Sequence, residues 1–263
     1  MASSSTLVVG GCVVTMDPSR RVLDQGAVLL AEGRIAWVGT ADECEQRAPP
    51  GTAVVDATNM LVLPGLVDCH AHAGHALVKT LGGDSGALWY DACHQIYTVG
   101  STEDFWGTEA ELAALERLKC GTTTGVSFLG GGDSVMRTDD TRYGDAHCRA
   151  VERVGTRSLV AIGPNRPLAG HEPWTYANYE PDSNTNTKDG PDVVLTRVDK
   201  EVTLETQLAT CAELIDRWHG KADDRIRIAM STPVHHCDRP LPAGVSVICL
   251  TTSQTARKIV ACL

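Results

Sequence analysis

The chain has 263 residues, with 23 Lys or Arg against 33 Asp or Glu, so its formal net charge is −10. A hydrophobic share of 43% and a charged share of 21% are typical of a globular protein rather than a disordered one. The acidic balance argues against binding to nucleic acid or to an anionic membrane surface, because phosphate groups are bound by clustered Lys and Arg. The length allows one large domain or two modest ones.

The ten cysteines and the N-terminal residues bear on the compartment of the protein. The closest cysteines, Cys237 and Cys249, are too far apart for the C-x-x-C pair of a zinc ribbon or a redox site. Residues 1–6 lack the basic residues of a signal peptide, and no apolar run approaches the roughly 18 residues of a membrane span. We therefore expect a cytoplasmic protein with reduced thiols and no membrane partner.

The first 60 residues predict a small, mostly antiparallel β module. Two β-branched runs flank Gly10-Gly11, and residues 26–39 have the pattern of a hairpin with its turn at Glu32-Gly33. We assign residues 1–60 to this module.

From residue 61 the pattern changes to alternating strands and helices. The expected strands are 61–67, 122–128, 157–162 and 225–230, and the expected helices are 103–119, 140–154 and 202–218. Repeated strand–helix–strand order implies a parallel sheet with right-handed crossovers.

Two details of this region concern a helix and a long insert. The helix 103–119 carries apolar residues at Leu112, Leu115 and Leu118 and ends at Cys120-Gly121, where glycine suits a helix terminus. Residues 163–200 form an irregular insert rich in Pro, Asn, Asp and Thr. Its aromatic residues favour a lid over a disordered excursion, because disordered segments contain few aromatics.

The segment with the clearest chemistry contains His70 and His72, directly after an apolar run. Side chains alternate along a strand, so these two imidazoles project the same way and can converge on one metal ion. They would lie at the C-terminal end of the strand, where barrel enzymes place catalytic groups. Neutral imidazole is a common ligand of zinc and iron, although an isolated H-x-H also occurs by chance.

Other polar residues allow two interpretations each. Asp68 faces the same side as His70 and either orients a ligand or is a polar residue at a strand end. His235 and His236 follow the fourth expected strand, and three roles stay open for them: substrate contact, additional metal ligand or surface loop residue. His75 fits packing better than support of a ligand. The histidines in helical contexts are expected to be packing or surface residues: His94, His147 and His219.

Three segments resemble the amidohydrolase superfamily of metal-dependent hydrolases. Residues 62–72, with sequence VLPGLVDCHAH, resemble its first-strand signature. Residues 15–18 and 32–39 resemble its small β-sandwich domain, and residues 118–124 resemble its junction between helix and second strand. The resemblance covers roughly residues 5–240. The most similar branch contains cytosine, guanine and S-adenosylhomocysteine deaminases and triazine chlorohydrolases.

The resemblance implies an α/β fold in which a small β-sandwich-like module, residues 1–60, precedes the N-terminal half of a TIM-type (β/α) barrel. That half barrel, about four βα units in residues 61–240 with the insert 163–200, is followed by an atypical tail, 241–263. The tail has no room for four more units, because one takes about 30 residues. We therefore expect a C-terminally truncated member of the family.

The resemblance also implies a site. His70 and His72 are metal ligands, His235 and His236 are tentative substrate contacts, and Asp68 is a tentative supporting residue. The metal is Zn, with Fe as the alternative. The family adds a His after strand five, a His after strand six and an acid/base Asp after strand eight. This Asp is expected to be absent from the chain, so its catalytic residues stay unknown.

Two functions remain open. The first is a metal-dependent hydrolase that uses a metal-activated water on a non-peptide C–N bond of a small cyclic or heteroaromatic substrate. The second is a catalytically inactive fragment of such an enzyme, which acts, if at all, through oligomerisation. An open half barrel exposes edge strands and apolar surface, so we expect a homo-oligomer or a chain that is unstable alone.

Overall fold

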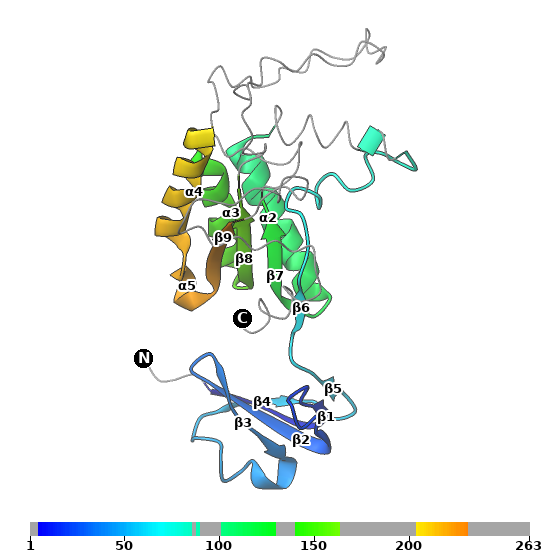
Figure 1. Cartoon of the computed structure of the whole chain (residues 1–263). Coiled ribbons are helices and arrows are strands. Elements are labelled where there is room, and N and C mark those ends of the chain that lie inside the picture. Colours follow the sequence, from blue (N-terminus) through cyan, green and yellow to red (C-terminus); the bar gives the residue numbers. More distant parts are fainter. Residues whose placement is uncertain (1–4, 86–87, 90–100, 130–139, 164–203, 231–263) are drawn as a thin grey trace. The chain divides into compact units, whose positions relative to one another are not determined.

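The computed structural model describes residues 5–85, 88–89, 101–129, 140–163 and 204–230 (Figure 1). It divides into two compact units, Met1–Gly65 and Leu66–Leu263. Most of the expected insert, together with His235, His236 and the tail 241–263, lies outside the described residues. Among the helices that the structure describes, none has the length and apolar composition needed to cross a membrane.

The first unit contains one five-stranded sheet. Strands β1, β2 and β3 are antiparallel neighbours, whereas β4 and β5 pair with β1 in parallel. The strands are β1 (Ser5–Val14), β2 (Val22–Ala31), β3 (Arg34–Thr40), β4 (Ala53–Asp56) and β5 (Leu61–Val62). The expected β module is therefore confirmed as a sheet, and its completion into a sandwich stays a prediction.

Two glycine-containing segments of this unit behave differently. Glu32 and Gly33 both have positive φ, 52° and 71°, as a two-residue type I′ hairpin turn requires, so the expected hairpin is confirmed. The runs around Gly10-Gly11, by contrast, belong to one strand. The pairing of β1 with β2 shifts register on both sides of Gly11, so the glycines form a bulge rather than a break.

The second unit contains a four-stranded parallel sheet in the order β6-β7-β8-β9. Its strands are β6 (Leu66–Asp68), β7 (Thr122–Phe128), β8 (Arg157–Ile162) and β9 (Ile226–Met230). The helices are α2 (Glu103–Lys119), α3 (Thr141–Val154), α4 (Leu204–Trp218) and the short α5 (Lys221–Asp224). The strands lie side by side in the same order as they occur in the sequence, as the expected half barrel requires. The barrel itself stays a prediction.

The expected strand 61–67 is divided in two. Pro64 and Gly65 separate β5, which pairs with β1, from β6, which pairs with β7. Proline has no N–H to donate to a ladder, so a continuous strand is interrupted there. The division between the two units falls at this break.

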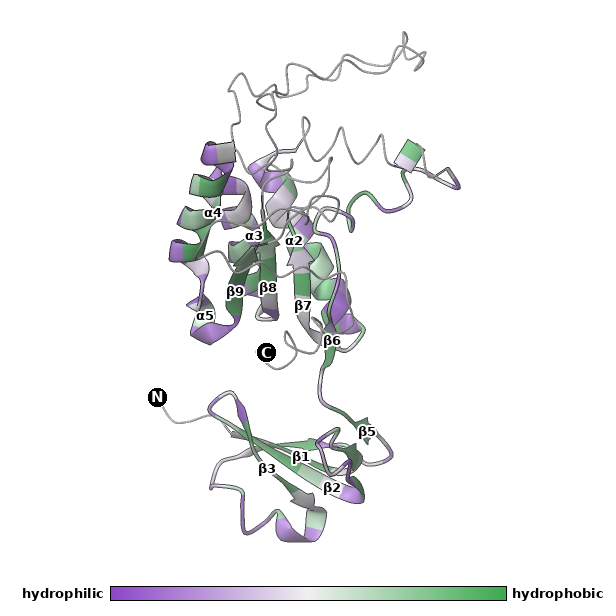
Figure 2. Ribbon diagram, viewed as in Figure 1, coloured by the Kyte–Doolittle hydropathy of each residue, from purple (hydrophilic) through white to green (hydrophobic). Residues whose placement is uncertain are grey.

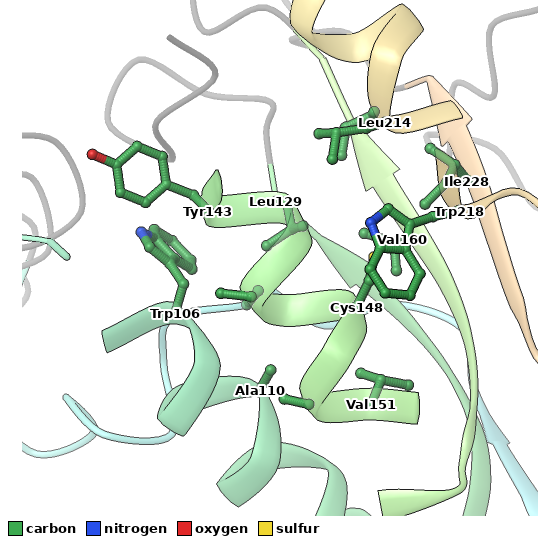
Figure 3. Packing of buried hydrophobic residues seen from close by; sticks show 14 of the residues in the cluster. Trp106, Ala110, Leu129, Tyr143, Cys148, Val151, Val160, Leu214, Trp218 and Ile228 are labelled. Atoms are coloured by element: carbon green, nitrogen blue, oxygen red, sulfur yellow. The ribbon is translucent and has the colours of Figure 1, made fainter. Parts of the chain in front are cut away.

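The helices α2, α3 and α4 share a core with one face of the parallel sheet (Figure 1). Figure 2 shows hydrophobic residues along β8 and β9 and a polar outer side on the helices. Ten labelled residues of this core appear in Figure 3: Trp106, Ala110, Leu129, Tyr143, Cys148, Val151, Val160, Leu214, Trp218 and Ile228. A second, smaller cluster on the other face contains Val126, Phe128, Leu159 and Ala161.

The buried face of α2 consists of one tryptophan and small residues. Leu115 and Leu118 are 44% and 43% exposed, whereas Trp106, Ala110 and Ala114 are buried. Small residues on this face allow α2 to approach α3 closely. The expected helix 103–119 is confirmed.

Truncation of Leu214 tests the shared core, because this α4 side chain is 2% exposed. We expect Leu214→Ala to lower the free energy of unfolding by about 2–5 kcal/mol, since it removes buried contacts and leaves a cavity. Urea unfolding followed by tryptophan fluorescence measures the change. Leu115→Ala is the control and should cost well under about 1 kcal/mol; equal losses would contradict the packing described.

Candidate metal centre

The candidate site lies in residues 66–78, which we call the histidine segment, at the C-terminal end of β7. The regular strand β6 ends at Asp68, so the histidines follow it rather than belong to it. The chain nevertheless stays extended beside β7, because the N–H of Phe128 donates to the carbonyl of Ala71 (2.8 Å) and that of Ala73 donates to Phe128 (3.0 Å). The histidine segment therefore crosses the sheet edge where parallel α/β proteins place ligands.

The rings of His70 and His72 converge. Their Nε2 atoms lie 3.3 Å apart, with ring centroids at 5.1 Å and planes inclined by 70°. Two imidazole nitrogens on one tetrahedral zinc ion, each at about 2.0–2.1 Å, would be about 3.3–3.4 Å apart. The spacing of these two atoms thus fits a shared metal ion.

The surroundings of the rings favour the neutral form of His72. Burial, and after it the neighbouring rings of His75 and His70, lowers the pKa of His72 to about 4. Phe128 packs against both rings, with its centroid 4.7 Å from His70 and 5.6 Å from His72. A neutral imidazole with a free lone pair is the form that binds a metal.

His75 extends this row of rings. Its centroid lies 5.3 Å from that of His72 and 5.4 Å from that of Trp89, and burial lowers its pKa. These ring contacts agree with the packing role that the sequence favours for His75.

Asp68 acts on the main chain of His70 rather than on an imidazole. Its Oδ1 accepts a hydrogen bond from the backbone N–H of His70 (3.2 Å). Its Oδ2 accepts one from Nε of Arg117 on α2 (3.1 Å). The Asp68 carboxylate therefore links the main chain at His70 to Arg117 of helix α2.

Arg117 is fixed on three sides. Besides the bond to Asp68, its guanidinium donates to Oγ of Ser127 and to the carbonyl of Val126, both at 3.2 Å. Gly125 provides the space for it, because a Cβ at this position would lie 2.8 Å from Nη1 of Arg117. The pair Asp68–Arg117 is thus held against β7.

Glu109 holds the other end of the histidine segment. This α2 side chain is completely buried. Its Oε1 accepts hydrogen bonds from the N–H groups of Gly74 (3.0 Å) and Ala76 (2.9 Å), and its Oε2 accepts one from Leu77 (2.7 Å). Three donors satisfy a buried carboxylate and fix the backbone just after His72.

A cavity of ≈ 20 Å³ lies beside these groups and is lined by residues that include His72, Glu109, Arg117 and His147. Such a volume holds about one water molecule. Nδ1 of His72 and both ring nitrogens of His147 are buried and have no hydrogen-bond partner among the residues that the structure describes. Metal-binding histidines commonly donate their second N–H to a carboxylate, a carbonyl or a water, so a water here would meet that need.

Comparisons with known proteins show what the chain is similar to. Residues 26–50 match a family described as an imidazolonepropionase-like composite domain of bacteria. The 5-methylthioadenosine/S-adenosylhomocysteine deaminase of Nitratidesulfovibrio vulgaris (Hildenborough) is 34% identical over 157 residues, which are 59% of this chain and 32% of the relative. The deaminase of the same name from Symbiobacterium thermophilum is 29% identical over 223 residues, 84% of this chain and 40% of the relative. Over these stretches the chain is similar to proteins of the amidohydrolase superfamily.

The fold is also shared with a solved structure. Atrazine chlorohydrolase TrzN from Arthrobacter aurescens TC1, complexed with zinc, aligns with a TM-score of 0.58 at 20% identity. The alignment covers 86% of this chain and 46% of TrzN. The α/β fold class is thereby confirmed. The chain spans less than half the length of each of these three proteins.

The described part of the chain contains the histidine pair and no group of three or more His, Cys, Asp or Glu side chains arranged to hold a metal ion. The two tentative substrate contacts, His235 and His236, lie outside that part. Glu109 and Arg117 were missed by sequence reasoning. The signal for Glu109 was its position beside Trp106 and Ala110 on the buried side of the helix, where a charge needs partners.

His147 on α3 gives the stability of the chain a specific pH dependence. Complete burial, and then the positive charge of Arg117, lowers the pKa of His147 to about 3. The unfolded chain has a histidine pKa of about 6.5, so below that pH it binds a proton that the folded chain does not. The contribution of neutral His147 to the free energy of unfolding is fully present above about pH 6.5 and is lost as the pH falls toward 3.

We expect His147→Leu to remove this acid sensitivity. The free energy of unfolding of the unaltered chain should fall, relative to the variant, by up to about 1.4 kcal/mol per pH unit below pH 6.5. Urea unfolding of both chains at pH 7.5, 6 and 5 measures the two slopes. Parallel slopes would show that the folded chain protonates His147.

Proposed function

We propose that this chain supplies the first two metal ligands of an amidohydrolase that hydrolyses a non-peptide C–N bond of a small cyclic or heteroaromatic molecule. The carrying observation is the 3.3 Å approach of the His70 and His72 Nε2 atoms at the C-terminal edge of a parallel sheet. The names of the two relatives, both deaminases, support the C–N bond. The substrates in the names of these deaminases and of atrazine chlorohydrolase support a small heteroaromatic molecule.

The metal in this proposal is zinc, with iron as the alternative, and the zinc in TrzN supports that order. Bound there, it would supply a Lewis acid that lowers the pKa of water and provides a nucleophile at neutral pH. The chain's own residues have separate tasks. His70 and His72 offer the ring nitrogens, Phe128 packs against both rings, and Asp68 holds the backbone of His70. His235 and His236 are proposed to contact the substrate.

Removal of either histidine tests the metal site. We expect the unaltered chain to keep about one zinc ion after dialysis, and His70→Ala and His72→Ala to weaken zinc binding by more than about 100-fold, because each loses a ligand. Metal analysis and competition with a chromogenic chelator measure occupancy and affinity. Cys120→Ser is the control, since this free thiol is exposed and distant in sequence.

Zinc that is lost equally in the Cys120 variant, or an unaltered chain that holds no zinc or iron, would contradict the proposed site. Hydrolysis of aminopurines, aminopyrimidines and triazines by the loaded chain then tests the substrate class. Zinc binding without turnover would favour the alternative, a catalytically inactive fragment that acts, if at all, through oligomerisation.

We also propose that the chain self-associates through the first unit. One face of its sheet has an apolar groove of ≈ 470 Å³, whose lining includes Val8, Val28, Leu30, Ile35 and Val38. Ile35 is 61% exposed and lies on β3, an edge strand of the sheet. Exposed apolar surface beside an unpaired edge favours pairing with a second copy of the chain.

Charge insertion tests the self-association. Sedimentation equilibrium should give a mass of two or more chains for the unaltered protein and of one chain for Ile35→Lys, because a lysine in the groove opposes its burial. Glu45→Lys places the same side chain at an exposed position in this unit and should leave the mass unchanged. A monomeric unaltered chain would contradict the proposal.

The cysteines support a cytoplasmic location. All six cysteines in the described ranges are free thiols: Cys12, Cys44, Cys69, Cys120, Cys148 and Cys211. Burial raises the pKa of Cys148 and Cys211, the latter to about 12, so these thiols stay protonated and unreactive. Unpaired thiols are typical of proteins in a reducing compartment.

A further inference from the structure

The helix α2 carries two charged side chains that contact the histidine segment on either side of the histidines. Glu109 and Arg117 are eight residues apart, about 12 Å along the helix axis. Glu109 binds the backbone after His72, and Arg117 binds Asp68 just before His70. We call these two residues the α2 clamp.

The Glu109 contact is specific to a carboxylate. Each of its oxygens already has a backbone donor, and the three N–H groups come from within four residues of one another. An amide in its place would turn an NH₂ group toward at least one of these donors and leave that N–H unsatisfied. The path of the chain after His72 therefore depends on the charge of Glu109.

The Arg117 contact is built into β7 as well as into α2. Bonds to Ser127 and Val126 hold the guanidinium, and Gly125 leaves the room that it occupies. Asp68, which accepts a hydrogen bond from Arg117, also accepts one from the main-chain N–H of His70 and so holds that residue in place. The side chain of Arg117 is 20% exposed, so this ion pair is only partly screened by water.

We propose that Glu109 and Arg117 are positioning residues that hold the backbone on both sides of His70 and His72, so that the two Nε2 atoms converge before a metal arrives. The inference rests on the proposed metal-binding function. A segment fixed at both ends does not have to be ordered by the metal, and the affinity for the metal rises accordingly.

One variant of the full chain, together with a matched control, tests the Glu109 contact of the clamp without metal. Amide hydrogen exchange should show slow exchange at Gly74, Ala76 and Leu77 in the unaltered protein. In Glu109→Gln these amides should exchange at least about tenfold faster, because one or more donors lose their acceptor. Arg153→Met is the matched control, since it removes an exposed ion pair between α3 and Glu111 of α2. Equal exchange in Glu109→Gln and the unaltered chain would overturn the inference.

Cobalt binding tests the effect on the histidines. Co²⁺ titrated into the full chain reports affinity and, through its visible absorption band, ligand geometry. Arg117→Met and Glu109→Gln should each weaken Co²⁺ binding about 10–100-fold and alter the band, as losses of supporting residues commonly do. Gly125→Ala should have the same direction of effect, because its Cβ displaces Arg117 without removing a charge.

Rescue separates positioning from general damage. The double variant Asp68→Asn with Arg117→Met keeps an oxygen for the His70 N–H without leaving an unpaired carboxylate. It should therefore bind Co²⁺ more tightly than Arg117→Met alone. Leu214→Ala, which weakens the core away from the histidine segment, should leave the absorption band unchanged.

The outcomes distinguish the two proposals. An unaltered chain that binds no Co²⁺ overturns the metal-binding function, and the exchange measurement on the metal-free chain still decides whether the clamp exists. Unchanged cobalt affinity and absorption in both Arg117→Met and Glu109→Gln, with normal binding by the unaltered chain, overturns the clamp alone.

Discussion

The burial of the Glu109 carboxylate is the constraint on which the rest of the site depends. A charge without access to water is costly, and three backbone N–H groups of the histidine segment offset that cost here. The same three hydrogen bonds fix the position of the backbone directly after His72. Removal of the segment from the helix would leave a bare carboxylate in the core, so α2 and the histidine segment fold together.

This interaction links fold and chemistry. The helix α2 packs on the sheet through Trp106 and the small residues Ala110 and Ala114, which brings its backbone close to the core. Glu109 and Arg117 then reach the C-terminal edge of β7, where the histidine segment passes. The rings of His70 and His72 converge within the segment that these contacts hold. The packing of Phe128 against both rings adds to the same arrangement.

The regular elements of the second unit could be predicted because their signals are local. Thr102 caps α2 by accepting a hydrogen bond from the N–H of Phe105, and Gly155 ends α3 with φ of 90°. The bulged β1 and the divided strand at Pro64 were less predictable, since glycine pairs and proline interrupt a ladder in more than one way.

The candidate site likewise contains residues that the sequence predicts and residues that it does not. The pair His70 and His72 is a local motif, and its period of two indicated a shared direction. Glu109 and Arg117 contact residues more than thirty positions away, so no local pattern predicts their partners.

The most direct test of this account is the position of zinc in a crystal of the full chain, found from anomalous scattering at the zinc edge. We predict one strong peak at about 2.0–2.1 Å from Nε2 of both His70 and His72, with Glu109 still bound to the N–H groups of Gly74, Ala76 and Leu77. Zinc bound elsewhere, such as at the cysteines, or bound to only one of the two histidines, would contradict it.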